Sequence, residues 1–103
     1  MSASFLILGK GGQLGAALAR LLGNDAHPLG MEEVNFTDKE FIKNLNLHTQ
    51  HKNYRAVFNA AAYTLVDKAE GEGKRDAFRI NAEAVGELAV WCKQRDLPLV
   101  HYS

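Results

Sequence analysis

Apolar positions along this chain fall into short blocks, and the spacing within a block differs from one block to the next. Residues 5–8 are apolar without interruption, which is typical of a parallel strand buried on both faces. Residues 13–22 carry leucines at three- and four-residue steps and no proline, which predicts a helix. We expect this helix to end at Gly23-Asn24, because these two residue types commonly cap a helix C-terminus.

The middle of the chain continues with a strand and a second helix. We expect a strand around residues 26–29, although Pro28 lacks the N–H group that a central strand uses in pairing. Residues 37–40 read Thr-Asp-Lys-Glu, a capping-box pattern that opens a helix. The apolar stripe of that helix consists of Phe41, Ile42 and Leu45.

The last third of the chain repeats this order. We expect a third strand at residues 56–58, a long amphipathic helix from about 74 to 95, and a fourth strand at 97–102. Trp91 and Cys92, adjacent on the helix, are expected to point to different sides, with Cys92 as a buried apolar filler. The apolar stripe of the long helix consists of Phe78, Val85, Leu88, Ala89 and Cys92.

Strict alternation of strand and helix predicts an α/β fold: a Rossmann-type parallel sheet of about four strands, with right-handed crossovers and helices on both faces. This is the first half of a doubly wound dinucleotide-binding fold. In such sheets a ligand lies across the carboxyl ends of the strands. That rule brings residues 9–15, residues 59–64, Tyr102 and Ser103 to one rim of the sheet.

A glycine-rich segment, Gly9-Lys10-Gly11-Gly12-Gln13-Leu14-Gly15, links the first strand to the first helix. Residues without Cβ are needed at the bend, at the point nearest a pyrophosphate, and where helix and strand touch; Gly9, Gly12 and Gly15 supply these positions. The free N–H groups and positive dipole end of the helix would face the anion. The alternative is a glycine turn with a purely structural role.

Composition narrows the choice of partners and location. The chain has 103 residues, enough for one domain with a core, and its 12 basic and 12 acidic residues cancel. No block of like charge indicates a nucleic acid or an anionic membrane surface as partner. The single cysteine cannot form an internal disulfide, and no stretch approaches the roughly 20 apolar residues of a membrane span. We therefore expect a reducing, cytoplasmic location.

Four segments carry a family resemblance: residues 9–15, residues 59–70 (NAAAYTLVDKAE), residues 80–82 (INA) and residues 101–103 (HYS). Together they resemble the dTDP-4-dehydrorhamnose reductases, which are extended short-chain dehydrogenase/reductases. Residues 59–70 are the most specific part of the match. The resemblance implies a reductase that uses NADPH or NADH to convert the sugar nucleotide dTDP-4-dehydro-L-rhamnose to dTDP-L-rhamnose.

The family also carries a Tyr-x-x-x-Lys pair, which donates the proton, and this pair does not occur in these 103 residues. We therefore expect residues 1–103 to be the NAD(P)-binding domain of such a reductase, truncated before the catalytic pair and the substrate domain and inactive alone. No catalytic residue is assigned. A homo-oligomer is compatible with the sequence. The alternative is a non-catalytic nucleotide-binding regulatory subunit, like the one that partners methionine adenosyltransferase.

The candidate cofactor-binding residues follow from the glycine turn and from the resemblance. Lys10 would meet a pyrophosphate or a 2′-phosphate, or remain a solvated loop lysine, and Glu32 or Glu33 would bind the adenosine ribose. These charges indicate use of both cofactors with a modest preference for NADPH. His48 and His51 share a helix face, but no third ligand completes a metal site. The complete cofactor set is Gly9, Lys10, Gly12, Gln13, Leu14, Gly15, Asn35, Phe36, Ala61, Ala62, Tyr63, Thr64 and Tyr102.

Overall fold

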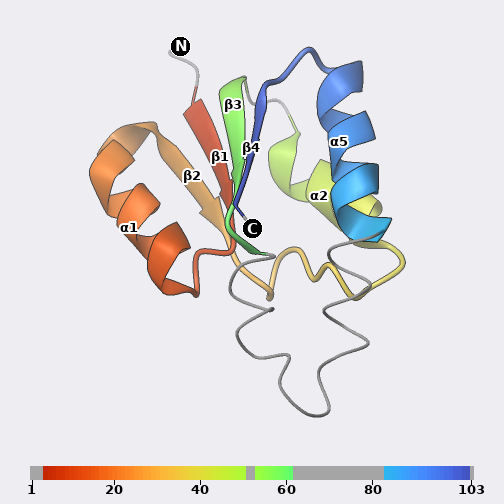
Figure 1. The fold of residues 1–103 in the computed structure, drawn as a ribbon, viewed down its shortest axis with the longest axis horizontal. Helices are drawn as coiled ribbons and strands as arrows, with labels where there is room; N and C mark the ends of the chain where they lie inside the picture. The colour runs from red at the N-terminus through yellow and green to blue at the C-terminus, as the bar shows by residue number, and fades with distance from the viewer. Residues whose placement is uncertain (1–3, 51–52, 62–82, 103) are drawn as a thin grey trace.

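Four parallel strands form one sheet in the computed structural model of the protein (Figure 1). The structure describes residues 4–50, 53–61 and 83–102. In the sheet the strands lie in the order β2-β1-β3-β4, and every pairing is parallel. The strands are β1 (Ser4–Leu8), β2 (Ala26–Leu29), β3 (Tyr54–Asn59) and β4 (Leu99–His101).

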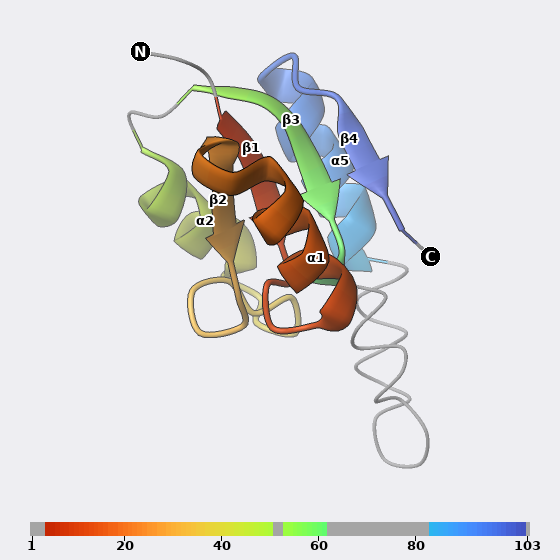
Figure 2. The same ribbon diagram turned by 90° about the vertical axis from the view of Figure 1, so that its left-hand side faces the viewer.

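Helices cover both faces of this sheet. Helix α1 (Gln13–Leu22) lies on one face, and α2 (Phe41–Thr49) and α5 (Val85–Gln94) lie on the other, as the two perpendicular views show (Figures 1 and 2). A short 3-10 turn, η1 (Gly23–Asp25), joins α1 to β2. The predicted α/β fold with a Rossmann-type parallel sheet is confirmed. Within the described residues, no helix is long and apolar enough to cross a membrane.

Strand pairing explains the buried apolar run at the start of the chain. Leu6 of β1 pairs with Val57 of β3, and both are completely buried. Among the described strands, β2 pairs with β1 alone and forms an edge of the sheet, which is why Pro28 is tolerated there. The end of α1 also follows the prediction: Gly23 has φ +56° and its N–H caps the carbonyl of Ala19.

The main core lies between the sheet and the helices α2 and α5. The rings of Phe36 and Phe41 lie 5.0 Å apart in it. At the α2–α5 contact, Trp91 Nε1 donates a hydrogen bond to Asn46 Oδ1 at 2.8 Å, and Arg95 stacks over the Trp91 ring at 4.2 Å. The core residues are Leu6, Leu8, Leu29, Val34, Phe36, Phe41, Leu45, Val57, Ala84, Leu88, Trp91 and Cys92.

The capping-box prediction for α2 was wrong. The helix begins at Phe41, four residues after the expected cap, and its N-cap residue Glu40 makes no side-chain capping bond. Thr37 instead donates its hydroxyl to Asn35 Oδ1 at 2.7 Å, and Asp38 Oδ1 accepts the N–H of Glu40 at 2.9 Å. Local side-chain-to-backbone turns thus satisfy the residues that the pattern had assigned to the helix start.

Two expectations for the C-terminal helix also need correction. Trp91 and Cys92 do not point to different sides: both are buried, at 3% and 2% exposure, and Ala89 is exposed. Trp91 and Cys92 lie seven and eight positions after the buried Ala84, that is, about two helical turns further along the same face. An apolar face of this width lets both adjacent residues reach the core. Residues 62–82, including Phe78, lie outside the described residues.

Strand β4 is shorter than predicted. It spans Leu99–His101 rather than residues 97–102, because the N–H of Leu97 bonds to the carbonyl of Cys92 and so belongs to the C-terminal turn of α5. Asp96, with φ +54°, makes the reversal that this turn needs. The chain therefore enters β4 only after Pro98.

Candidate functional site

A cleft of about 210 Å³ lies at the carboxyl ends of the strands. Three segments form it: the turn after β1, the loop after β2 and the second residue after β3. Strand β1 has neighbours on both sides, and the chain connects it to β2 on one side while β3 lies on the other. This is the switch point at which parallel α/β sheets bind ligands. The lining residues are Gly9, Lys10, Gly11, Gly12, Gly30, Met31, Glu32, Val34, Phe36 and Ala61.

Two glycines of the turn are required by the fold itself. Gly9 has φ +93°, and a Cβ there would lie 2.6 Å from the backbone nitrogen of Ala61. A Cβ on Gly15 would lie 2.0 Å from the carbonyl oxygen of Gly9. Gly15 therefore allows α1 to pack against the turn after β1. The sequence predicted instead that this glycine allows contact between the helix and the strand itself. The turn is also anchored to β2, since the N–H groups of Gly9 and Lys10 both donate to Leu29 O, at 2.9 and 3.1 Å.

The two middle glycines are not held by such contacts. A Cβ on Gly11 would meet no atom within 4 Å, and Gly12 has φ −92° and ψ 169°, an extended conformation open to any residue. Both line the cleft. Gly12 is the N-cap of α1 and has no side chain to satisfy the helix. Within the described part of the chain, the N–H groups of Gln13 and Leu14 have no acceptor, so the positive end of α1 is open to an anion.

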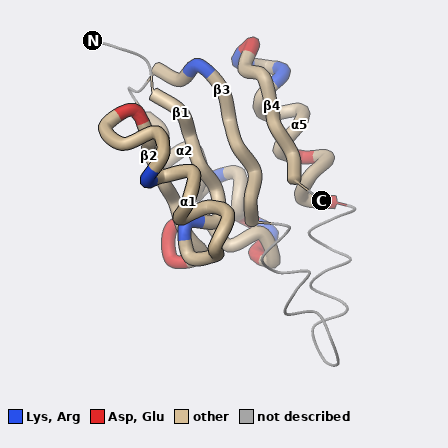
Figure 3. The backbone as a smooth tube through the Cα atoms, turned by 60° about the vertical axis from the view of Figure 1, so that its left-hand side comes forward, with Lys and Arg blue, Asp and Glu red and all other residues tan. Residues whose placement is uncertain are grey.

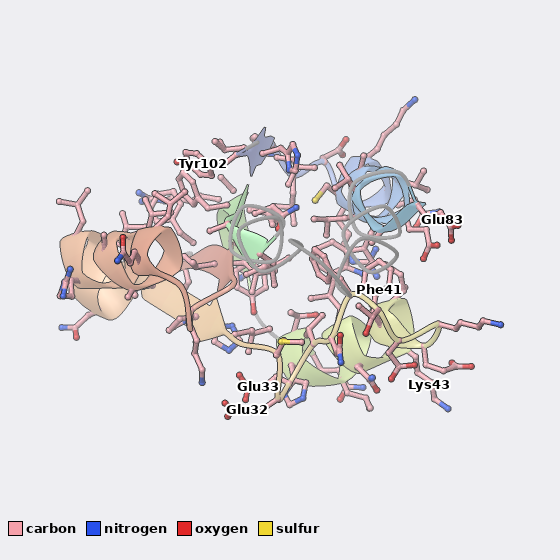
Figure 4. The ribbon with its side chains drawn as sticks, turned by 60° about the horizontal axis from the view of Figure 1, so that its bottom comes forward. Glu32, Glu33, Phe41, Lys43, Glu83 and Tyr102 are labelled. Atoms are coloured by element: carbon pink, nitrogen blue, oxygen red, sulfur yellow. The ribbon has the colours of Figure 1, made fainter. Side chains whose placement is uncertain are left out.

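The charged residues of the site are arranged differently from the sequence-based interpretation. Lys10 Nζ lies 3.1 Å from Glu33 Oε1, and the same oxygen accepts the N–H of Gly30 at 2.7 Å. These contacts hold the pKa of Glu33 below its usual value, the Gly30 hydrogen bond first and Lys10 second. Glu32 is exposed and lines the cleft. Figure 4 shows Glu32 and Glu33 side by side on the loop after β2, and Figure 3 shows charged positions in the loops as well as on the helices.

Asn35 and Phe36 have separate environments although they are adjacent. Asn35 Oδ1 accepts the N–H and the hydroxyl of Thr37, at 3.0 and 2.7 Å, so its side chain is used within its own loop. Phe36 is 1% exposed, packs on Phe41 and presents part of its surface to the cleft. Of this pair, only Phe36 lines the cleft, and nearly all of its surface is taken up by the core.

Asn59 is a structural residue of the site that sequence analysis treated only as part of a motif. It is completely buried at the end of β3, where its Oδ1 accepts the N–H of Ala61 at 3.2 Å and its Nδ2 lies 3.2 Å from His101 Nδ1. It thereby fixes the Ala60-Ala61 backbone that Gly9 contacts. A polar residue closing an apolar strand was the available signal, because buried amides require partners.

The remaining candidates are distributed as follows. Gln13 and Leu14 form the first turn of α1, and neither lines the cleft. Tyr102 donates its N–H to Asn59 O at 3.3 Å and lies across the strand ends from Glu32 and Glu33 (Figure 4). The candidates outside the described residues are Ala62, Tyr63 and Thr64.

Sequence analysis missed three lining residues, Gly30, Met31 and the buried Val34. Gly30 follows β2 directly, and the alkyl stem of Lys10 lies over it: a Cβ there would come within 3.1 Å of Lys10 carbons. Met31 is 50% exposed and adds an apolar surface to the cleft. A glycine immediately after a predicted strand was the signal for Gly30; nothing in the pattern singled out Met31 or Val34.

The possible metal ligands and nucleophiles of the described segments include His and Cys residues. These segments contain no group of three or more His, Cys, Asp or Glu residues that could hold a metal ion, and His51 lies outside them. Cys92 is buried, and burial raises the pKa of its thiol to about 11. The thiol stays protonated at neutral pH, in agreement with a packing role.

The sequence of the chain is similar to those of known reductases. The chain is 35% identical to the dTDP-4-dehydrorhamnose reductase of Mycolicibacterium smegmatis, over 100% of this chain and 31% of that protein. It is 38% identical to the reductase of the same name from Burkholderia thailandensis, over 95% of this chain and 32% of that protein. The chain therefore spans about a third of the length of these relatives.

A solved structure has the same fold. The crystal structure of a hypothetical dTDP-4-dehydrorhamnose reductase from Sulfolobus tokodaii superimposes with a TM-score of 0.72 and 33% sequence identity, covering 95% of this chain and 38% of that one. The family model described as the RmlD substrate binding domain matches residues 3–103. This match covers nearly the whole chain, and the protein belongs to the RmlD substrate binding domain family.

Proposed function

We propose that this chain binds a nicotinamide dinucleotide, NADH or NADPH, in the cleft at the strand ends, as the cofactor-binding part of a reductase. The reductase would act on the sugar nucleotide dTDP-4-dehydro-L-rhamnose to give dTDP-L-rhamnose. The observation that carries the proposal is the N-terminus of α1, which has no side-chain cap and lies beside the unobstructed Gly11 and Gly12. The names of the relatives support the reductase part.

The residues of the cleft fit the parts of a dinucleotide. Gly11 and Gly12 leave room for the pyrophosphate to approach the backbone, and the N–H groups of Gln13 and Leu14 are available to it. Glu32, which lines the cleft, would accept hydrogen bonds from the adenosine ribose, and Met31, with the small lining surface of Phe36, would contact the adenine.

When bound, the nicotinamide cofactor supplies the hydride. The contribution of this chain would be to bind and orient the dinucleotide. The proton for the developing alkoxide would come from a Tyr-x-x-x-Lys pair in a longer protein, since no such pair occurs in these 103 residues. The relatives described above are named reductases, and none of these names indicates a regulatory subunit, so the enzyme is favoured over the non-catalytic alternative.

The proposal is tested by titration calorimetry with NADPH. Gly12→Val places a side chain where the pyrophosphate must approach, while its backbone conformation suits valine. We expect affinity to fall at least about thirtyfold, or ~2 kcal/mol. Unchanged affinity in a folded Gly12→Val variant would overturn the proposal.

A matched pair of alanine variants separates binding from folding. A Cβ at Gly11 and a Cβ at Gly86 each meet no atom within 4 Å, but only Gly11 lines the cleft. Gly11→Ala is expected to weaken NADPH binding, and Gly86→Ala to leave it unchanged. Circular dichroism melts of both variants check that the fold is retained.

A further inference from the structure

An ion pair joins the two walls of the cleft. Lys10 belongs to the turn after β1 and Glu33 to the loop after β2, and their charged atoms lie 3.1 Å apart. Both side chains are held in place by backbone. The Glu33 carboxylate accepts the N–H of Gly30, and the Lys10 stem lies over the same glycine, within 3.1 Å of where a Cβ would stand.

The loop that carries Glu33 is itself closed by hydrogen bonds. The N–H groups of Glu33 and Val34 both donate to the carbonyl of Gly30, at 3.1 and 2.9 Å. The loop backbone thus keeps the Glu33 carboxylate beside Gly30 and Lys10. It is less exposed than its partner, with a side-chain exposure of 20% against 40% for Lys10.

The pair changes the charge that a ligand would meet. Among the described residues, those that line the cleft or pair with a lining residue contribute one cation, Lys10, and two carboxylates, Glu32 and Glu33. The single positive charge is already neutralised by Glu33, and Glu32 is left as a net negative charge. A 2′-phosphate, which carries between one and two negative charges at neutral pH, would meet this surplus of negative charge.

Building on the proposed function, we propose that Glu33 is a specificity-determining residue that holds Lys10 away from a 2′-phosphate and thereby makes the cleft prefer NADH to NADPH. The sequence alone indicated use of both cofactors with a modest preference for NADPH, from the charge of Lys10 weighed against repulsion by Glu32 or Glu33. The structure pairs Lys10 with Glu33. Glu33 acts through Lys10, so it is a positioning residue with respect to the cofactor.

The decisive variant is Glu33→Gln, which removes the charge but keeps an oxygen to accept the N–H of Gly30. The Lys10 charge, once freed from Glu33 and about 8 Å from a phosphate with two negative charges in a water-like dielectric, changes phosphate affinity by about fivefold. We expect Glu33→Gln to bind NADPH about fivefold more tightly and NADH within twofold of the unchanged chain. The measurement is the dissociation constant of each cofactor, by calorimetry, in the same buffer and salt.

Two further variants complete the test. Asp25→Asn removes an acidic charge at the opposite end of β2 and is expected to leave the ratio of the two constants unchanged. In a Lys10→Gln background, Glu33→Gln should change the ratio clearly less than in the unchanged chain, because the cation that it releases is gone and only the direct repulsion between Glu33 and the phosphate is removed. A full fivefold effect in that background would overturn the role of Lys10.

The outcomes are distinguishable from failure of the proposed function. If both cofactors bind and Glu33→Gln leaves their ratio within twofold, the specificity inference is wrong while the cofactor site stands. If the unchanged chain prefers NADPH, the inference is also wrong. If neither cofactor binds to the folded chain, the proposed function fails and the inference fails with it.

Discussion

Replacing Gly15 with alanine tests whether the contact between α1 and the glycine turn holds the fold together. The added Cβ would lie 2.0 Å from the carbonyl oxygen of Gly9, 2.7 Å from the carbonyl carbon and 3.1 Å from Lys10 Cα. All three are backbone atoms, so no flexible side chain can move aside. Ordinary contact begins at 3.4 Å, so α1 and the turn must separate by about 1.4 Å.

The expected loss of stability combines two opposing effects. Overpacking a well-packed site costs about 1–3 kcal/mol, and a clash between backbone atoms belongs at the upper end of that range. Alanine gains about 1 kcal/mol over glycine from helix propensity. We therefore expect Gly15→Ala to lower the free energy of unfolding by about 2 kcal/mol. For a domain of this size the melting temperature would fall by about 8–16 °C.

Thermal melts followed by circular dichroism measure this effect, and Gly86→Ala is the matched control. Gly86 lies within α5, where a Cβ would meet no atom within 4 Å. The same chemical change there should raise stability by up to about 1 kcal/mol. Opposite signs for the two variants are the expected result. A Gly15→Ala variant as stable as the unchanged chain would refute the packing argument.

Three further outcomes are expected. Asn46→Ala removes the acceptor of the buried Trp91 Nε1, and urea denaturation should show a loss of about 1–2 kcal/mol, with a smaller loss in Asn46→Asp, which keeps an acceptor. Burial raises the pKa of the Cys92 thiol from 9.0 in the unfolded chain to about 11 in the folded one, so the free energy of unfolding should fall as pH rises from 9 to 11. Urea titrations at several pH values measure this slope, and Cys92→Ala should remove the part that the thiol contributes. The purified chain lacks the Tyr-x-x-x-Lys proton donor, so it should oxidise no NADPH in the presence of dTDP-4-dehydro-L-rhamnose. Absorbance at 340 nm measures this reaction, and measurable turnover would show that another group donates the proton.

The sheet could be predicted from the sequence because its signals are local and redundant. The apolar run at residues 5–8 and the helix capped at Gly23 each carry their own pattern, and both are present as expected. Pro28 was difficult to reconcile with a central strand, and the position of β2 at the edge of the sheet explains why it is accepted. That position depends on the order of the strands, which the local sequence pattern does not give. Element types and the rim of the sheet that carries the site were thus readable, whereas the order of the strands was not.

Errors arose where two local interactions compete for the same residues. Thr37 and Glu40 match a capping box, yet Asn35 and Asp38 offer nearer partners and delay the helix to Phe41. Such competition is decided by small energy differences that spacing alone does not reveal. The Lys10–Glu33 pair was hidden for another reason: its partners are 23 positions apart and meet only because β1 and β2 are adjacent and parallel.

The glycine motif combines two requirements that look identical in a sequence. Gly9 and Gly15 are needed by the polypeptide itself, because a Cβ at either position would collide with backbone of the turn or of Ala61. Nothing in the backbone conformation of Gly12, or in the space around Gly11, demands glycine, and both line the cleft. Glycine carries a conformational entropy cost on folding, so a glycine that the fold does not need calls for another explanation. Close approach of a pyrophosphate to the end of α1 supplies that explanation, and for this reason variants at positions 11 and 12 test binding whereas variants at positions 9 and 15 test folding.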